Sequence, residues 1–74
     1  MRIIVKLFAT FRADRFDIEA REYPAGTTVA QIVDELGLSR DKLGIVMVNS
    51  RHVELGRELH DGDTLALFPL VGGG

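Results

Sequence analysis

The residues best suited to chemistry in this 74-residue chain are three consecutive glycines, Gly72, Gly73 and Gly74, which end in a carboxylate. None of them has a side chain that can pack, and glycine loses more conformational freedom on ordering than any other residue. We therefore expect residues 72–74 to form a flexible tail. Five extended residues span at most about 16–18 Å, so the stretch from Leu70 to Gly74 could place the carboxylate inside a partner's narrow pocket. The alternative is a frayed end or a linker, the commonest meaning of a glycine run at a chain end.

The composition of the chain narrows the other chemistry it could perform. Its lack of cysteine excludes disulfides, thiolate catalysis and cysteine-ligated zinc or iron–sulfur sites. The two histidines, His52 and His60, are predicted on separate turns or edges, so we expect no metal site. Asp61 and Asp63 flank Gly62, and in such a position they are typical turn formers rather than a catalytic pair.

The charges of the chain favour neither nucleic acid nor membrane as a partner. Nine basic and eleven acidic residues are interleaved and give a net charge of −2. A nucleic-acid footprint requires a basic stripe, and the sequence shows none. No apolar run is long enough to span a bilayer, and no signal-peptide pattern is visible. We therefore expect a cytoplasmic protein.

The elements that must position the tail begin with two predicted strands. Residues 2–11 alternate between two faces, and the face without charges is predicted to be buried. That core face comprises Ile3, Val5, Leu7, Ala9 and Phe11. After a polar hairpin loop at residues 12–15, a second strand is predicted to have one apolar and one wet face. Its apolar face comprises Phe16, Ile18 and Ala20.

The hydrophobic period changes after residue 23, which predicts an amphipathic helix. Its apolar stripe recurs at helical spacing and comprises Val29, Ile32, Val33 and Leu36. Thr28 and Gln31 fit a capping box at the start of this helix, because each side chain can bind the other residue's backbone N–H. Gly37 is suited to the left-handed conformation that ends many helices.

Three further strands complete the predicted fold. Residues 45–48 are predicted to form a strand that is buried on both sides or flanked by other strands. Residues 52–55 are predicted to lie at an edge, and residues 65–68 to bury Leu65 and Leu67. Pro69 lacks an N–H, so strand pairing should loosen there. The order β-β-α-β-β-β favours one main helix on one face of a mixed four- to five-stranded sheet, with the first and last strands parallel in the middle. This α+β arrangement is the ubiquitin-like β-grasp, formed by residues 1–71 as one domain.

Three stretches of the sequence resemble the MoaD/ThiS-type sulfur carrier proteins, and the resemblance runs essentially from end to end. Phe8-Ala9-Thr10-Phe11-Arg12 resembles the family's Phe-Ala-x-x-Arg at the end of the first strand. Asp61-Gly62-Asp63 resembles the turn before the family's last strand. Residues 68–74, from Phe68 to Gly74, resemble its carboxyl-terminal signature and are the most specific of the three.

The resemblance implies a carrier that acts with partner enzymes and is not itself an enzyme. An adenylating enzyme of the ubiquitin-activating type would convert the Gly74 carboxylate into an acyl adenylate, and a sulfur donor would then displace AMP and leave a thiocarboxylate. A sulfur-acceptor enzyme, such as a molybdopterin synthase large subunit, would receive the sulfur. The carrier would bind no cofactor, because ATP and any zinc belong to the activating enzyme. Gly72 and Gly73 would let the tail thread the partner's active site.

The predicted sheet also indicates a partner interface. If Ile3, Val5 and Leu7 face the helix, alternate residues of the same strand face outward together with the end of the last strand. The predicted interface comprises Ile4, Phe8, Phe68, Pro69 and Leu70. A contiguous exposed apolar patch usually marks an interface, although each of these side chains could instead be half covered by a loop. Arg12 is expected only to anchor a loop.

Departures from the family pattern leave the pathway open. The molybdopterin branch typically ends in Pro-Pro-Val, a small residue and Gly-Gly, whereas here Leu70 replaces the second proline and Gly72 the small residue. Pro69 favours that branch, which we prefer, but residues 71–74 are similar to many thiamine-branch carriers. Related carriers also serve cysteine biosynthesis and tungsten-cofactor assembly. Two alternatives from other classes are a protein modifier joined through Gly74 to lysines, and a β-grasp interaction module with an inert tail.

Overall fold

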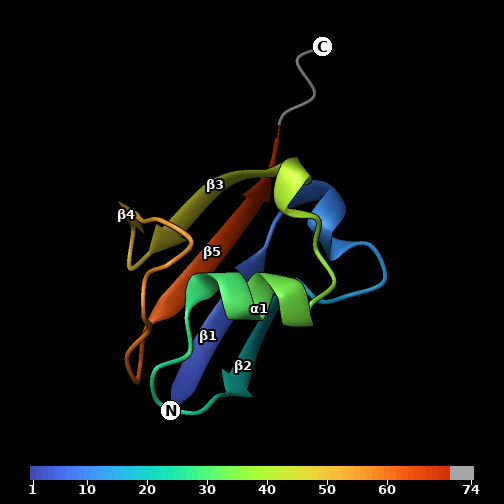
Figure 1. Cartoon of the computed structure of the whole chain (residues 1–74). Helices are drawn as coiled ribbons and strands as arrows, with labels where there is room; N and C mark the ends of the chain where they lie inside the picture. The colour runs from blue at the N-terminus through green and yellow to red at the C-terminus, as the bar shows by residue number, and fades with distance from the viewer. Residues whose placement is uncertain (71–74) are drawn as a thin grey trace.

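The computed structural model describes residues 1–70, which form a mixed sheet with a single α-helix packed on one face (Figure 1). The strands are β1 (Arg2–Leu7), β2 (Ile18–Glu22), β3 (Leu43–Val48), β4 (Arg51–His52) and β5 (Thr64–Pro69). The α-helix is α1 (Val29–Glu35), and the 3-10 helices are η1 (Ala9–Arg12) and η2 (Arg40–Lys42). The predicted tail at residues 72–74 and the predicted domain boundary at residue 71 lie outside the described residues.

The five strands follow one another across the sheet in the order β2-β1-β5-β3-β4. The central strands β1 and β5 run parallel, with Val5 opposite Leu65, while the other neighbouring pairs are antiparallel. This topology confirms the predicted ubiquitin-like β-grasp fold, including the placement of the first and last strands side by side.

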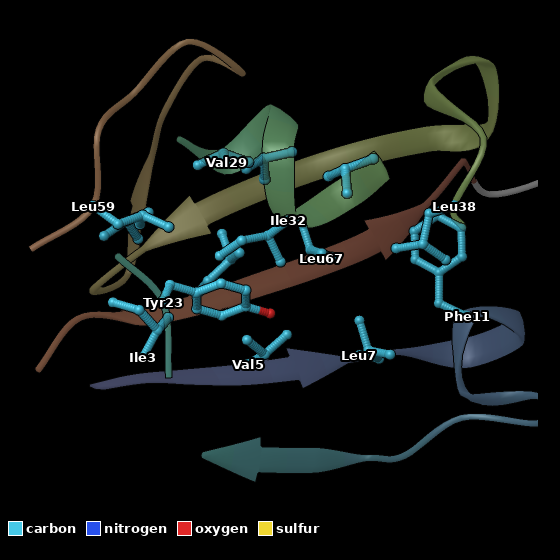
Figure 2. Close-up of a cluster of buried hydrophobic side chains, with 14 residues drawn as sticks. Ile3, Val5, Leu7, Phe11, Tyr23, Val29, Ile32, Leu38, Leu59 and Leu67 are labelled. Carbon is cyan, nitrogen blue, oxygen red and sulfur yellow. The ribbon is translucent and has the colours of Figure 1, made fainter. Parts of the chain in front are cut away.

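The core lies between α1 and the central strands (Figure 2). The predicted inward residues of β1, of β5 and of the helix are all fully buried: Ile3, Val5, Leu7, Leu65, Leu67, Val29, Ile32 and Val33. Leu36, the last residue of the predicted helix stripe, packs against this cluster but is only partly buried. The alternation of apolar residues along β1 and β5, and their helical spacing along α1, therefore predicted the residues that are buried between the sheet and the helix.

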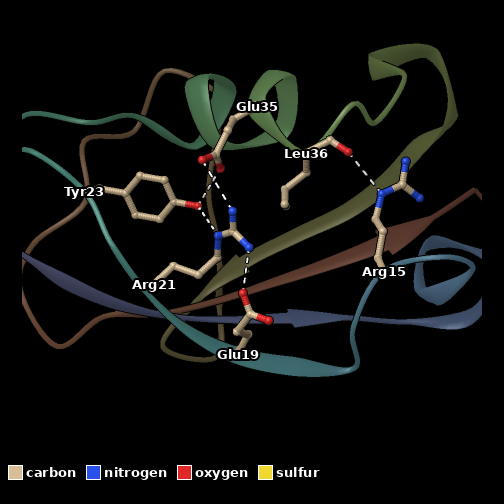
Figure 3. A network of polar contacts seen from close by, with 6 residues as sticks. All are labelled: Arg15, Glu19, Arg21, Tyr23, Glu35 and Leu36. Carbon is tan, nitrogen blue, oxygen red and sulfur yellow. Dashed lines mark hydrogen bonds and ion pairs between the residues drawn. The ribbon is translucent and has the colours of Figure 1, made fainter.

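Both ends of α1 are capped as the sequence predicts. The Thr28 hydroxyl oxygen accepts a hydrogen bond from the Gln31 N–H at 3.3 Å, and the Gln31 side chain accepts one from the Thr28 N–H at 2.9 Å. Gly37 has a positive φ of 72°, which confirms its left-handed conformation after the helix. Arg15 makes a hydrogen bond that the sequence did not predict: its Nε donates to the Leu36 carbonyl oxygen at 3.0 Å (Figure 3). This bond satisfies a carbonyl left unpaired at the helix end.

The first strand is shorter than predicted, because it ends at Leu7 rather than continuing to Phe11. Residues 9–12 instead form η1, which begins with Ala9 at a φ of 51°. Ala9 is exposed, so its predicted place in the core is wrong. Phe11 is buried as predicted, but it reaches the core from η1.

The predicted apolar face of β2 is also wrong. Ile18 is 59% exposed and Ala20 is exposed as well. Ala20 lies opposite Ile4, so it occupies the side of the sheet that faces away from α1, whereas Arg21 lies opposite the buried Ile3. The reason is that β2 is an edge strand, where Arg21 can pair with Glu35 of α1 and remain partly solvated.

The other strands and turns need smaller corrections. β3 is buried only on its helix side, through Val46 and Val48, while Ile45 is 42% exposed. Of the two predicted alternatives, burial on both sides is therefore wrong, and a strand flanked by others is confirmed, because β3 lies between β5 and β4. β4 contains only Arg51 and His52, rather than residues 52–55. Gly62 has a φ of 88°, which confirms the predicted turn.

Candidate functional site

The side of the sheet that faces away from α1, here called the open face, contains a pair of stacked aromatic rings. Phe8 follows β1 and Phe68 belongs to β5, and their ring centroids lie 4.0 Å apart with an angle of 10° between the planes. The Phe8 N–H donates to the Leu67 carbonyl oxygen at 3.2 Å, which continues the parallel pairing of these two strands by one residue. We call Phe8 and Phe68 the aromatic pair. Both side chains are only half-buried, so the pair is accessible to a partner.

Arg12 contacts the same pair. Its guanidinium carbon lies 5.5 Å from the centre of the Phe8 ring, a distance typical of a cation–π contact. Its Nε donates to the Leu7 carbonyl oxygen at 2.9 Å and lies 3.5 Å from the Asp17 carboxylate. Arg12 therefore anchors the η1 loop as expected, and it also holds a positive charge against the Phe8 ring.

The structure separates the predicted interface residues into two groups. Ile4 and the aromatic pair lie on the open face, with Lys6 between Ile4 and Phe8 along β1. Pro69 and Leu70 instead line a hollow of about 370 Å³ beside η1 and η2, together with Phe11 and Leu38. Leu70 is 59% exposed, so it is accessible from this side.

The end of β5 is held to β3 through an irregular pairing. The register shifts between Leu43 and Ile45, where Leu43 lies opposite Pro69. The predicted loosening at Pro69 thus takes the form of a bulge. Pairing resumes one residue later, because the Leu70 N–H donates to the Lys42 carbonyl oxygen at 2.8 Å. The chain is consequently fixed in direction up to residue 70.

The two aspartates around Gly62 serve as turn formers, as predicted. Asp61 accepts a hydrogen bond from the Arg2 N–H at 2.7 Å, and Asp63 accepts one from the His60 N–H at 2.8 Å. Asp63 is buried and also accepts from the Asn49 amide at 2.9 Å. Burial alone would raise the pKa of Asp63, but these hydrogen bonds outweigh it and hold the pKa below its usual value.

A polar network joins β2 to the helix and has no part in the open face (Figure 3). The Tyr23 hydroxyl donates to Glu35 at 2.7 Å and accepts from Arg21 Nε at 2.9 Å. Arg21 also pairs with Glu19 at 2.7 Å. The network fixes an edge strand to α1, and its role is structural.

Within residues 1–70, no group of three or more histidine, aspartate or glutamate side chains is arranged to hold a metal ion. In the same residues, no helix is both long and apolar enough to cross a membrane. The predicted site residues Gly72, Gly73 and Gly74 lie outside the part of the chain that the structure describes.

Comparison with known proteins agrees with this arrangement. The crystal structure of SAMP1 from Haloferax volcanii is 27% identical, with all of both chains covered and a TM-score of 0.78. A protein assigned as molybdopterin converting factor, subunit 1, from Pyrococcus furiosus is 30% identical, with 93% of this chain and 97% of that chain covered and a TM-score of 0.76. The complex of subunits 1 and 2 of molybdopterin-converting factor from Helicobacter pylori matches at 18% identity over 100% of both chains, with a TM-score of 0.67, and supports the fold alone. No curated protein matches.

The fold and these likenesses define a MoaD/ThiS-type ubiquitin-like protein. Residues 5–74 match the ThiS family, and the chain belongs to it. It is therefore a sulfur carrier or a ubiquitin-like modifier, a class of small proteins that act with partner enzymes.

Proposed function

We propose that this chain carries sulfur as a thiocarboxylate on Gly74. The observation that carries the proposal is that the family match continues through the three glycines to residue 74, beyond the folded strands. A terminal acyl group provides a sulfur site without cysteine, which this chain lacks. β5, the last strand before those residues, lies in the middle of the sheet.

The proposed reaction has two steps. A carboxylate is a poor electrophile, so an ATP-dependent adenylating enzyme first joins the Gly74 carboxylate to AMP and releases pyrophosphate. Sulfur from a donor then attacks the acyl carbon, the bond to AMP breaks, and a thiocarboxylate remains. Glycine at residues 72–74 leaves the acyl carbon unhindered and lets the backbone pass close to the nucleotide. ATP and any zinc belong to the partner, and we place the reaction in the cytoplasm.

We further propose that the open face docks the adenylating enzyme. The aromatic pair provides a half-buried apolar centre, and Ile4 lies on the same face. Aromatic residues commonly supply the dominant contacts of protein interfaces. Leu70, exposed at the end of β5, would be contacted where the chain enters the enzyme.

The Pyrococcus furiosus relative favours molybdopterin synthesis as the pathway that receives the sulfur. The Helicobacter pylori protein forms a complex with subunit 2 of its molybdopterin-converting factor. We propose a corresponding large subunit as the sulfur acceptor for this chain. Thiamine, tungsten-cofactor and cysteine synthesis remain the competing destinations.

Intact-mass spectrometry tests the sulfur-carrier function directly. The full chain is incubated with ATP, sulfide and the adenylating enzyme of the ubiquitin-activating type encoded in the same genome. We expect replacement of one carboxylate oxygen by sulfur, and no such product from a chain lacking Gly74 or carrying Gly74→Leu. Equal sulfur incorporation by these variants would show the proposal to be wrong.

A second candidate function is protein modification, which the likeness to SAMP1 favours, because another structure of that molecule is described as small archaeal modifier protein 1. In that reaction a lysine amine of a target attacks the activated Gly74, and an isopeptide replaces the thiocarboxylate. Isolation of adducts joined through Gly74 to lysines would support it. Thiocarboxylate as the only product would count against it.

A further inference from the structure

A groove of about 400 Å³ lies on the open face beside the aromatic pair. Its apolar lining residues are Phe8, Phe68, Met47 and Ala66, and its polar lining residues are Lys6, Asn49, Ser50 and Thr64. No aspartate or glutamate lines it within residues 1–70, although the chain has eleven acidic residues. The groove is thus amphipathic, and its one charged lining residue is positive.

Lys6 has apolar neighbours on both adjacent strands. On β1 it is flanked in register by Ile18 of β2 on one side and Ala66 of β5 on the other, and it is half-buried. It forms no ion pair with any residue of the described part of the chain. A partner that covers the open face would remove water from this ammonium, and an unpaired charge in that position is costly. A carboxylate on the partner would offset the cost.

The other polar lining residues also favour an anion. The Asn49 amide nitrogen donates to Asp63 and its oxygen accepts from the Thr64 N–H, so this side chain is held in place within the chain. The hydroxyls of Ser50 and Thr64 line the groove and can donate to a carboxylate held by Lys6. The groove therefore offers donors from three side chains.

Ser50 occupies a backbone conformation that glycine would adopt more easily. Asn49 and Ser50 form the turn between β3 and β4, with φ values of 51° and 68°. Asparagine is favoured at the first of these positions and glycine at the second. Strained residues are common at functional sites, and Ser50 is one of the residues that line the groove.

We propose that this groove binds an acidic side chain of the adenylating enzyme, with its carboxylate paired to Lys6 and its neighbouring apolar atoms packed on the aromatic pair. This inference rests on the proposed function, because it assigns the chemistry of the partner that docks on the open face. Lys6 then selects for partners with an aspartate or glutamate at this position and disfavours those with a lysine or arginine.

Titration calorimetry with the same adenylating enzyme, at two salt concentrations, tests the pairing. We expect Lys6→Glu to weaken binding by about tenfold or more, Lys6→Met by about threefold to tenfold with a reduced salt dependence, and Lys6→Arg by no more than about twofold. Ser50→Gly should raise the melting temperature and yet weaken binding, because it relieves the strain and removes the hydroxyl.

Arg51→Glu is the matched control. Arg51 lies opposite the buried Val48 and therefore projects on the helix side of the sheet, so the same reversal of charge is made away from the groove. We expect its effect on affinity to be about twofold or less. Lys6→Met retains the apolar stem of the side chain, so it serves as a second test if Lys6→Glu fails to fold.

The outcomes separate this inference from the proposed function. If the Lys6 variants bind with wild-type affinity and still acquire sulfur, or if Arg51→Glu weakens binding as much as Lys6→Glu, the pairing is overturned and the carrier function stands. If the wild-type chain is neither bound nor adenylated by this enzyme, the proposed function fails and the pairing fails with it.

Discussion

A β-carbon added to Gly44 would lie 2.7 Å from the carbonyl oxygen of Pro69, closer than real side chains approach a backbone atom. Gly44 thus packs tightly against the Pro69 backbone, at the bulge where Leu43 is opposite Pro69. The absence of a side chain at Gly44 lets β3 and β5 approach each other next to the hydrogen bond from the Leu70 N–H to the Lys42 carbonyl oxygen. Gly44 therefore helps to fix the point at which the chain leaves the sheet.

Gly44→Ala should destabilise the protein. The obstructing atoms belong to the Pro69 backbone, which cannot move as a flexible side chain can, so we expect a loss of about 1–3 kcal/mol in the free energy of unfolding. Urea unfolding measures this loss. Gly56→Ala is the matched control, because nothing lies within 4 Å of an added β-carbon there, and it should change stability by about 0.5 kcal/mol or less. Equal effects of the two changes would contradict the steric explanation.

Phe8→Asp or Phe68→Asp should weaken binding to the adenylating enzyme and leave the fold intact. Both rings are half-buried on the open face, outside the core formed with α1. Removal of a central aromatic contact commonly costs about 2 kcal/mol or more, so we expect at least about a thirtyfold loss of affinity by calorimetry. Circular dichroism checks the fold. Unchanged affinity in a folded variant would remove the open face as the docking surface.

Much of the fold could be predicted because local patterns and tertiary packing agree in the central elements. Val29, Ile32 and Val33 recur at helical spacing, and the buried Leu65 and Leu67 alternate along β5. These residues lie between α1 and the central strands, where the opposite layer covers every side chain that points inward. The outward direction of Phe8 and Phe68 followed from the same alternation.

The rest depended on contacts between distant residues. Alternation divides β2 into two faces, but it does not show which face meets the helix, and Arg21 occupies that side because Glu35 of α1 is there to bind it. Likewise, the pattern that continues to Phe11 does not reveal that the chain turns after Leu7. The stacking of the aromatic pair and the groove at Lys6 required the register of β1 against β5, which no local pattern contains.

The Tyr23 hydroxyl should titrate well above the usual range. Burial raises the pKa of Tyr23 to about 12, and the hydrogen bond that it donates to Glu35 adds to the effect. Because the folded pKa exceeds the unfolded value of 10.0, the associated stability is fully present below pH 10 and is lost as the pH rises toward 12. Tyr23 is the only tyrosine, so ultraviolet absorbance of tyrosinate reports it alone.

Tyr23→Phe provides the control for this titration. It should lower stability at neutral pH by about 1 kcal/mol, because Glu35 and Arg21 lose a hydrogen-bond partner. It should also flatten the fall in stability between pH 10 and 12. A tyrosine titration near pH 10 in the folded wild-type protein would refute the assigned environment.

Asp63 should make the fold sensitive to acid. Although burial opposes ionisation, the hydrogen bonds from the His60 N–H and the Asn49 amide hold the pKa below 3.8. The stability that comes from the ionised carboxylate is therefore present above the unfolded pKa and is lost as the pH falls through the lower, folded value. Unfolding measured between neutral pH and pH 2 should show this decline.

Asp63→Asn should cost about 1–3 kcal/mol at neutral pH and weaken the acid dependence, because the amide cannot accept both hydrogen bonds in the same way. The exposed Asp41→Asn provides a comparison on the surface and should change stability little. An acid profile of Asp63→Asn identical to that of the wild type would assign the acid sensitivity to other carboxylates.

The central position of β5 has a consequence for synthesis of the protein on the ribosome. Because β5 lies between β1 and β3, a nascent chain interrupted before Thr64 leaves both of those strands without their shared neighbour. The sheet can close only after residues 64–69 have emerged from the exit tunnel. Prematurely terminated products therefore expose their apolar strand faces and are open to proteolysis. Cellular quality control would thus remove the chains that stop before Thr64, whereas a chain that loses only its last residues keeps β5 and can still fold.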